Sequence, residues 1–478
     1  MNCMDTRRTS QPHLLPRIPA AVAALGVALA ASGVAASAQA PGPDPAAPAS
    51  AQPALTLHDA IRQALGQSPD AAAAKADTQS AKAGASLART MLLPQLGLTE
   101  DISRGNDPVY VFGSRLRQQQ FTAANFALDA LNRPTPIGNF ATRFGGQWNA
   151  FDSFKTQRTI RAAEFMRKSA DSAQEAVDQK IVLDVVQAYQ SVLYAERQVQ
   201  VAQHQQETAD ALLSSVDDRV KAGLAVESDR MSAQVNVAAR KQELITAQGA
   251  LELAWAQLRV AMGAPDLKSA PLEPLQPHDF PQKPLEDELA TAAKTRPDLA
   301  ALAHAQSAQS AAVAAARSDF GPRIGAYGNW EMDKPTFTSS GGNNWVAGVQ
   351  LNIDILPFAR RAQLAQQSAA KARVDAAMSS SQQQMRLQVS QAHIARQTAS
   401  LSLDTARAAV DQAAESLRIL RNRYSAGLAT MTDLLAAEDA ERLAQTNYWH
   451  AVYGNAVAYA QLLFATGTLT PDAAEDLQ

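Results

Sequence analysis

Side chains that could bind a metal or attack a substrate are sparse along this chain. Its seven histidines are scattered, with no two at the spacing of a metal site, and Cys3 is the single cysteine. Glu286, Asp287 and Glu288 are adjacent, but acidic residues at the start of a predicted helix stabilise its positive end. No Ser-His-Asp set, carboxylate pair or phosphate loop fits its predicted surroundings. The sequence therefore predicts that the protein is not an enzyme and has no catalytic residues, no metal site and no cofactor.

The charge balance excludes a further class of protein. The 478 residues include 43 Lys and Arg against 46 Asp and Glu, which gives a net charge of −3. Binding to nucleic acid needs a clustered basic surface, so the sequence predicts no nucleic-acid partner. Aromatic residues make up only 5% of the chain, and this scarcity favours long helices over a compact aromatic core.

The N-terminal segment has the pattern of a secretory signal peptide over residues 1–40. Three arginines precede an apolar run, which ends at the small-residue site Ala38-Gln39-Ala40. A retained membrane anchor is the alternative, but the run is short for spanning a bilayer. The next segment, 41–54, is expected to be a flexible leader because it contains five prolines. Residues 468–478 are expected to form a C-terminal tail.

Proline is absent from two long stretches, 137–264 and 358–470, and glycine is sparse in both. Because these residues end helices, their scarcity permits very long ones. Two adjacent apolar stripes along residues 181–193 suit a ring of helices, with a buried helix in an ordinary bundle as the alternative. The predicted helices span 57–92, 154–221, 227–262, 285–318, 358–425 and 431–466.

The chain is internally duplicated. A first structural repeat, 55–263, and a second, 285–467, are joined by a proline-rich strap over 264–284. The opening Leu57-His58-Asp59 aligns with Leu285-Glu286-Asp287, and similar correspondences recur along both halves. We expect the strap to cross the outside of the helices.

Short segments between the helices alternate apolar and polar residues at the period of a β-strand. They predict one hairpin in each half, at about 95–153 and 322–356, with a long outer loop over 105–138 in the first. Of the 26 aromatic residues, 15 fall in two windows around these hairpins. An apolar face with clustered aromatics favours a transmembrane β-barrel over a soluble sheet. The predicted aromatic girdle of the barrel consists of Phe140, Phe144, Trp148, Trp330 and Trp345.

Two hairpins supply four strands, which are too few to close a barrel. An open sheet edge in lipid leaves backbone groups without hydrogen-bond partners, so the chain is expected to oligomerise. Three copies would supply 12 strands, but the strand count alone leaves both a trimer and a tetramer open.

These features, in this order, resemble the outer membrane efflux protein family, the TolC-like exit ducts of Gram-negative bacteria. The resemblance covers about 55–470. It rests on the doubled helix–hairpin–helix–turn–helix order and on two matching turns, Ala222-Gly223-Leu224 and Ala426-Gly427-Leu428. It implies a mainly α fold with a small transmembrane β-barrel. Three identical chains would form a 12-stranded barrel among outer-membrane lipid, and the barrel would continue as a long α-helical tunnel in the periplasm.

The resemblance also implies a function and partners. The protein would be the outer-membrane exit duct of a tripartite efflux or type I secretion system, and it would conduct substrates passively to the outside. A periplasmic adaptor protein would couple it to an inner-membrane efflux pump or ABC exporter. The alternative, from another class, is a periplasmic coiled-coil structural protein without a pore.

The same resemblance places the site residues at the periplasmic tip of the helices. The adaptor-docking turns would be formed by Gly223 and Leu224 in the first repeat and by Gly427 and Leu428 in the second. Each glycine is expected to adopt a positive φ at a sharp turn between helices, where a side chain would strain the backbone.

A candidate gate lies beside these turns. Tyr424, Asp433 and Asp229 match gate positions of the family, and Glu227 is a further candidate. For Glu227 and Asp433 the alternative role is that of an acidic residue at the start of its own helix. The arginine of the family's gate is replaced here by Ala429, so the ionic latch is expected to be incomplete.

Overall fold

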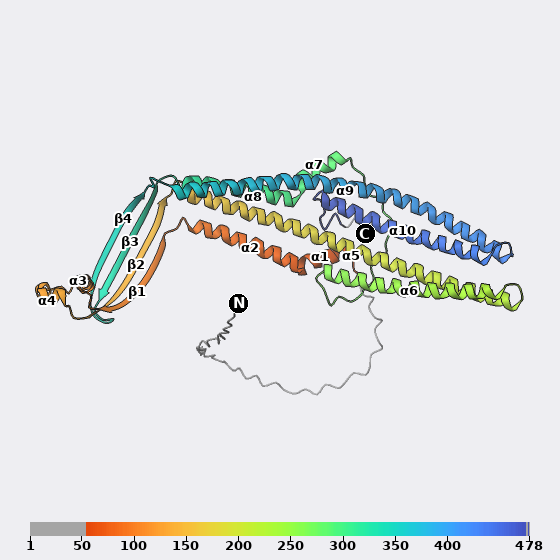
Figure 1. Ribbon diagram of the computed structural model, residues 1–478, viewed down its shortest axis with the longest axis horizontal. Helices are drawn as coiled ribbons and strands as arrows, with labels where there is room; N and C mark the ends of the chain where they lie inside the picture. The colour runs from red at the N-terminus through yellow and green to blue at the C-terminus, as the bar shows by residue number, and fades with distance from the viewer. Residues whose placement is uncertain (1–53, 475–476, 478) are drawn as a thin grey trace, which may run out of the picture. The chain divides into compact units, whose positions relative to one another are not determined.

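A computed structural model describes residues 54–474 and residue 477. The predicted signal peptide, 1–40, lies outside the described residues, as does the predicted leader apart from residue 54. The described part is mainly helical and contains one small antiparallel sheet (Figure 1). The prediction of a mainly α fold is therefore confirmed.

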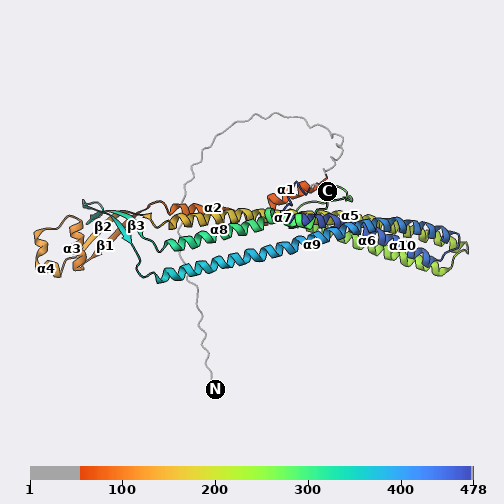
Figure 2. The same cartoon turned by 90° about the horizontal axis from the view of Figure 1, so that it is seen from above.

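Two long helical hairpins make up most of the described part. Helix α5 (Lys155–Lys221) turns back into α6 (Glu227–Ala261), and α9 (Phe358–Ser425) turns back into α10 (Met431–Ala465). Helices α5 and α9 each extend over about 100 Å at 1.5 Å per residue. Figures 1 and 2 show that both turns lie at the end of the helices farthest from the sheet.

Among the described residues, no helix combines the length and the apolar character needed to cross a membrane.

Two predicted helices, 57–92 and 285–318, are each divided in two by a proline, and the prediction of continuous helices was wrong there. Pro69 and Pro297 disfavour the helical conformation of the residue before them. That residue is extended in both repeats, with ψ of 132° and 118°. The resulting helices are α1 (Leu57–Gln67), α2 (Pro69–Thr90), α7 (Leu285–Thr295) and α8 (Pro297–Ser318).

The sheet has four antiparallel strands in the order β1-β2-β3-β4, so the hairpins of the two repeats are neighbours. Strands β1 and β4 each pair on one side only within the described part of the chain. The strands are β1 (Gln95–Gly105), β2 (Ile137–Phe151), β3 (Arg323–Lys334) and β4 (Gly342–Asn352).

The strand register gives the sheet two chemically different faces. One row of paired residues crosses all four strands as Leu98, Phe144, Trp330 and Trp345, and their side chains share the face that we call the apolar face. The next row lies on the opposite face, which we call the polar face; it consists of Thr99, Arg143, Glu331 and Asn344. The alternation in the sequence thus corresponds to a sheet with one apolar and one polar side.

The connection between β1 and β2, predicted as a long loop, is partly helical. Asp107 accepts a hydrogen bond from the Tyr110 amide (2.8 Å) and so caps the first helix of this segment. The rings of Phe112, Phe121 and Phe126 pack edge to face. We call residues 107–136 the insert; it contains α3 (Pro108–Arg117), the short 3-10 helix η1 (Ala123–Phe126) and α4 (Leu128–Asn132).

The largest buried cluster lies where α1, α5, α6 and the strap meet. Tyr189 is fully buried, and its hydroxyl donates to the Leu55 carbonyl (2.9 Å). The strap over 264–284 contributes Leu275 and Phe280, which are both buried. The strap is therefore packed onto the helices that it connects.

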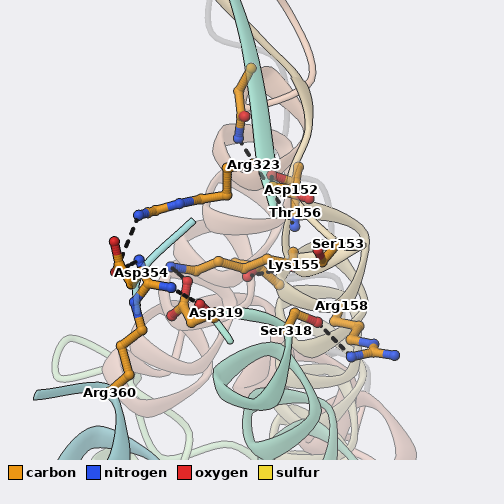
Figure 3. Close-up of polar contacts among 12 residues, drawn as sticks. Asp152, Ser153, Lys155, Thr156, Arg158, Ser318, Asp319, Arg323, Asp354 and Arg360 are labelled. Carbon is orange, nitrogen blue, oxygen red and sulfur yellow. Dashed lines mark hydrogen bonds and ion pairs between the residues drawn. The ribbon is translucent and has the colours of Figure 1, made fainter. Parts of the chain in front are cut away.

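A cluster of polar contacts joins the sheet to the helices (Figure 3). Lys155 Nζ, at the start of α5, lies 2.8 Å from Asp319 Oδ1. Arg360, near the start of α9, donates to the Asp319 carbonyl and pairs with Asp354. Arg323 Nη2, at the start of β3, lies 3.7 Å from Asp354 Oδ2. These contacts fix the direction in which the long helices leave the sheet.

Candidate functional site

Both turns at the far end of the helices have the same backbone geometry. In the first, Gly223 has φ of +74°, its amide donates to the Val220 carbonyl (3.0 Å), and the Leu224 amide donates to the Arg219 carbonyl (2.8 Å). The second turn has the same two bonds, and its Gly427 has φ of +73°. This pair of bonds is the helix-ending arrangement that glycine favours, because it lacks the Cβ that crowds a left-handed backbone.

Apolar side chains project from both turns. Leu224 is 71% exposed and Leu428 is 68% exposed. No atom would lie within 4 Å of a Cβ placed on either turn glycine, so the turns are open on the outside. Each turn thus presents an apolar side chain to its surroundings.

The predicted gate tyrosine is buried between the two helical hairpins. Tyr424 of α9 packs with Val216 of α5 and with Met431 and Leu434 of α10. Burial raises the pKa of Tyr424, and the negative charge of Asp229 raises it further. Among the described residues, the Tyr424 hydroxyl has no hydrogen-bond partner. Tyr424 and Asp229 are thus close enough to interact electrostatically, but no hydrogen bond joins them.

A residue that the sequence reasoning missed links the two hairpins. Arg219 Nη1 of α5 donates to the carbonyls of Ser425 (3.2 Å) and Tyr424 (3.4 Å) at the end of α9. Its guanidinium also lies over the Tyr424 ring, 5.0 Å from the centroid. The cation beside the tyrosine thus comes from α5 rather than from position 429, where the chain has Ala429. The sequence signal was the repeat itself, since Arg219 and Arg423 occupy equivalent positions.

The predicted acidic gate residues make contacts within their own helices. Asp433 Oδ2 accepts from the Thr430 amide (3.0 Å) and hydroxyl (2.7 Å), while the Asp433 amide donates to the Thr430 hydroxyl (3.1 Å). These bonds and the nearby Arg423 lower the pKa of Asp433. Glu227 forms an ion pair with Arg230, one turn further along α6. Helix-end stabilisation therefore accounts for the contacts of Asp433, and a local ion pair for those of Glu227.

The aromatic residues of the predicted girdle lie at different heights on the sheet. Phe144, Trp330 and Trp345 form part of one row across three strands. Trp148 lies nearer the helices, where its Nε1 donates to the Leu92 carbonyl (3.0 Å). Phe140 lies toward the other end, with its ring 6.3 Å from that of Phe337.

Comparison with known proteins places this architecture in a family. Residues 60–264 and 289–468 match the family model described as outer membrane efflux protein. The two matched segments cover both repeats, and the chain belongs to the outer membrane efflux protein family.

Individual relatives agree with this assignment. The chain is 25% identical over 427 residues to the alkaline protease secretion protein AprF of Pseudomonas aeruginosa, covering 87% of this chain and 85% of the relative. The solved structure of CusC matches with a TM-score of 0.73 at 19% identity, over 86% of this chain and 92% of that one. The CmeC outer membrane channel of Campylobacter jejuni matches with a TM-score of 0.73 at 18% identity, over 88% and 89%. The likeness to the two structures concerns the fold.

Membership of the family defines what the protein does. It is an outer-membrane exit duct of a Gram-negative bacterium that extends into the periplasm and serves efflux or secretion. Proteins of this family are channels rather than enzymes, and they work with periplasmic adaptor proteins and inner-membrane pumps.

Proposed function

We propose that three copies of this chain form a 12-stranded barrel, with the apolar face toward lipid and the polar face toward a water-filled passage. The observation that carries this proposal is the two-faced sheet, whose outer strands β1 and β4 each lack one partner within the described part of the chain. Closure between copies would pair those edges and leave no open backbone in the membrane. The helices would continue the passage into the periplasm.

The turns at Gly223 and Gly427 are the proposed docking site for the adaptor protein. Both lie at the end of the helices opposite the sheet, and each presents an exposed leucine (Figure 1). The duct itself performs no chemistry, so the energy for transport comes from the inner-membrane pump.

Contacts between the two hairpins are the proposed restraint on the closed tip. Arg219 holds the end of α9 against α5, and Tyr424 fills the space between the hairpins. Moving the α9–α10 hairpin away from α5 would break both contacts. Docking of the adaptor at the neighbouring turns is therefore well placed to open the tip.

Paired substitutions at the docking turns test this function. Leu224→Asp with Leu428→Asp should abolish export and cross-linking to the adaptor, while the protein remains a folded oligomer in the outer membrane. The matched control is Leu224→Met with Leu428→Met, which keeps both side chains apolar and should preserve export. Full export by the aspartate variant would remove these turns from the docking site.

The class of substrate is tested in a strain that lacks this chain. The name of the relative AprF, an alkaline protease secretion protein, favours export of a polypeptide. A missing secreted protein with unchanged drug susceptibility would support secretion, whereas increased drug susceptibility alone would support efflux of small molecules.

A further inference from the structure

The insert between β1 and β2 is seated on the sheet rather than projecting freely from it. One side of α3 is formed by Val111, Ser114 and Gln118, which follow the spacing of a single helix face, and all three are buried. Figure 1 shows α3 at the end of the sheet that lies farthest from the long helices.

The side of the sheet that receives α3 is the polar face. Gln118 Nε2 donates to Asn139 Oδ1 (2.9 Å), and Asn139 Nδ2 donates to Asp333 Oδ1 (2.7 Å). Asn344 Nδ2 donates to the Arg117 carbonyl at the end of α3 (3.2 Å). The register places Asn139, Asp333 and Asn344 on the polar face. A buried hydrogen-bond chain therefore fixes α3 to that face.

Two further contacts strengthen this seat. At the first turn of α3, the Tyr110 hydroxyl lies 3.0 Å from the Ser103 hydroxyl of β1. At the last turn of α3, a Cβ added to Gly342 would lie 2.0 Å from the Arg117 carbonyl oxygen. The start of β4 can therefore approach α3 this closely only because the residue is glycine. The helix is thus held across the sheet, from β1 to β4.

The opposite side of α3 is apolar and exposed. Val109 is 81% exposed and Leu116 is 49% exposed, and both point away from the side that contacts the sheet. Phe126 and Leu128, in the rest of the insert, are also exposed. The insert therefore presents apolar side chains on the side that faces away from the sheet.

We propose that the insert narrows the outer mouth of the duct, with α3 seated inside the passage and its apolar side turned toward the axis. This inference rests on the proposed function, in which the polar face lines the passage. A barrel of 12 strands has a backbone diameter of about 24 Å. A helix with its side chains is about 10 Å thick, so three copies of α3 on the wall would occupy most of the opening. The resulting ring of valine and leucine forms an apolar constriction at the outer end.

Size-selective labelling of a cysteine behind α3 tests the inference. In the full chain carrying Cys3→Ser, Gln350→Cys places a thiol on the polar face, and Val349→Cys places one on the apolar face. Intact cells are treated from outside with a small charged methanethiosulfonate or with a much wider polyethylene-glycol maleimide. With the native insert, Gln350→Cys should react readily with the small reagent and slowly with the wide one, while Val349→Cys should react with neither.

Releasing the insert should remove the size selection. Val111→Asp with Gln118→Ala disrupts the seat, and replacement of residues 107–136 by a short Gly-Ser turn removes the insert. Either change should make the wide reagent react about tenfold faster with Gln350→Cys. Val109→Thr, a change of similar size on the other side of α3, serves as the control and should keep the slow rate.

Three outcomes would decide against the inference. Equal rates for the two reagents with the native insert would show that α3 does not obstruct the passage, even if neither release variant folds. Slow labelling by the wide reagent after release would place the obstruction elsewhere. Labelling of Val349→Cys in place of Gln350→Cys would instead refute the assignment of the faces and, with it, the proposed function.

Discussion

At the scale of single residues, the contact between Arg219 and the end of α9 is the most specific link across the tip. It combines two hydrogen bonds to backbone carbonyls with a guanidinium lying over the Tyr424 ring. This arrangement supplies a cation to the tyrosine although position 429 is alanine. The tip thus has a cationic side chain beside the tyrosine, and the α5–α6 hairpin supplies it.

Removing this cation should loosen the closed tip. A cation–π contact of this kind contributes about 1 kcal/mol, so Arg219→Ala should raise the open fraction roughly fivefold. The measurement is the closed-state conductance of single channels in planar bilayers. Arg423→Ala is the matched control, because Arg423 occupies the equivalent position in the second repeat and, among the described residues, its one side-chain hydrogen bond goes to its own turn, at the Leu428 carbonyl (3.4 Å). Equal conductance of the two variants would argue against a special role for Arg219.

The start of α10 should become less stable in acid. The pKa of Asp433 is lowered because Thr430 donates to its carboxylate. A carboxylate with a lowered pKa stabilises the folded state above its unfolded pKa of about 3.9, and this contribution is lost as the pH falls through the folded-state pKa. The protection factors for amide hydrogen exchange at residues 430–434, which compare each rate with that of an unfolded chain at the same pH, should therefore fall in Asp433→Ala at neutral pH, and in the unchanged protein below pH of about 4.

Asp229 provides the control for this prediction. It lies at the equivalent position of α6, but the cap residue there is Val226, which has no side-chain hydrogen bond to offer. Asp229→Ala should consequently leave exchange at the start of α6 nearly unchanged. Similar acceleration in the two variants would mean that general charge effects, rather than the bonds to Thr430, protect the helix start.

At the scale of elements, the strap is held by an arginine buried within the helices. Arg396 of α9 donates to the Phe280 carbonyl (2.8 Å) and to Asn455 Oδ1 (3.0 Å). Asn455 Nδ2 in turn donates to the His278 carbonyl (2.9 Å). The Phe280 ring stacks on Tyr459 of α10, 4.3 Å between centroids. These contacts bind the strap to the second hairpin although it follows the first in sequence.

Loss of Arg396 should release the strap. Hydrogen bonds to a charged group contribute about 1.5–3 kcal/mol each, so Arg396→Ala should destabilise this region by a similar amount or more. Limited proteolysis should then cut within 264–284 faster than in the unchanged protein. Arg418→Ala, which removes an exposed ion pair with Glu415 on the same helix, should not alter the cleavage. Unchanged cleavage in Arg396→Ala would show that apolar packing alone holds the strap.

At the scale of the whole molecule, strands β1 and β4 each lack one partner within the described part of the chain, and the proposed assembly of three copies rests on these two edges. A sheet edge in lipid is strongly unfavourable, and closure within one chain is excluded because four strands are too few. The proposed 12-stranded barrel predicts a protein mass near three chains in native mass spectrometry of the protein in mild detergent. A monodisperse monomer that retains its strand signal, or a tetramer, would overturn the proposed trimer.

Local sequence patterns determined most of the element plan. The long proline-free stretches correspond to α5 and α9, and the period-two alternation corresponds to a sheet whose faces differ in polarity. Gly223 and Gly427 mark turns because a positive φ is a property of the local backbone. The prediction of continuous helices failed at Pro69 and Pro297, because the backbone preference of the residue before proline outweighed the helical pattern of the surrounding residues.

Contacts between distant parts of the chain were decided by the tertiary structure alone. Arg219 and Tyr424 are separated by 205 residues, and Gln118 reaches the polar face only because β2, β3 and β4 are assembled beneath it. The sequence by itself determined where the long helices, the strands and the two tip turns occur, since periodicity, proline and glycine act over a few residues. It could not determine which side of the sheet receives the insert or which arginine meets the tyrosine, because those choices depend on burial and hydrogen bonds that exist only after distant elements have packed together.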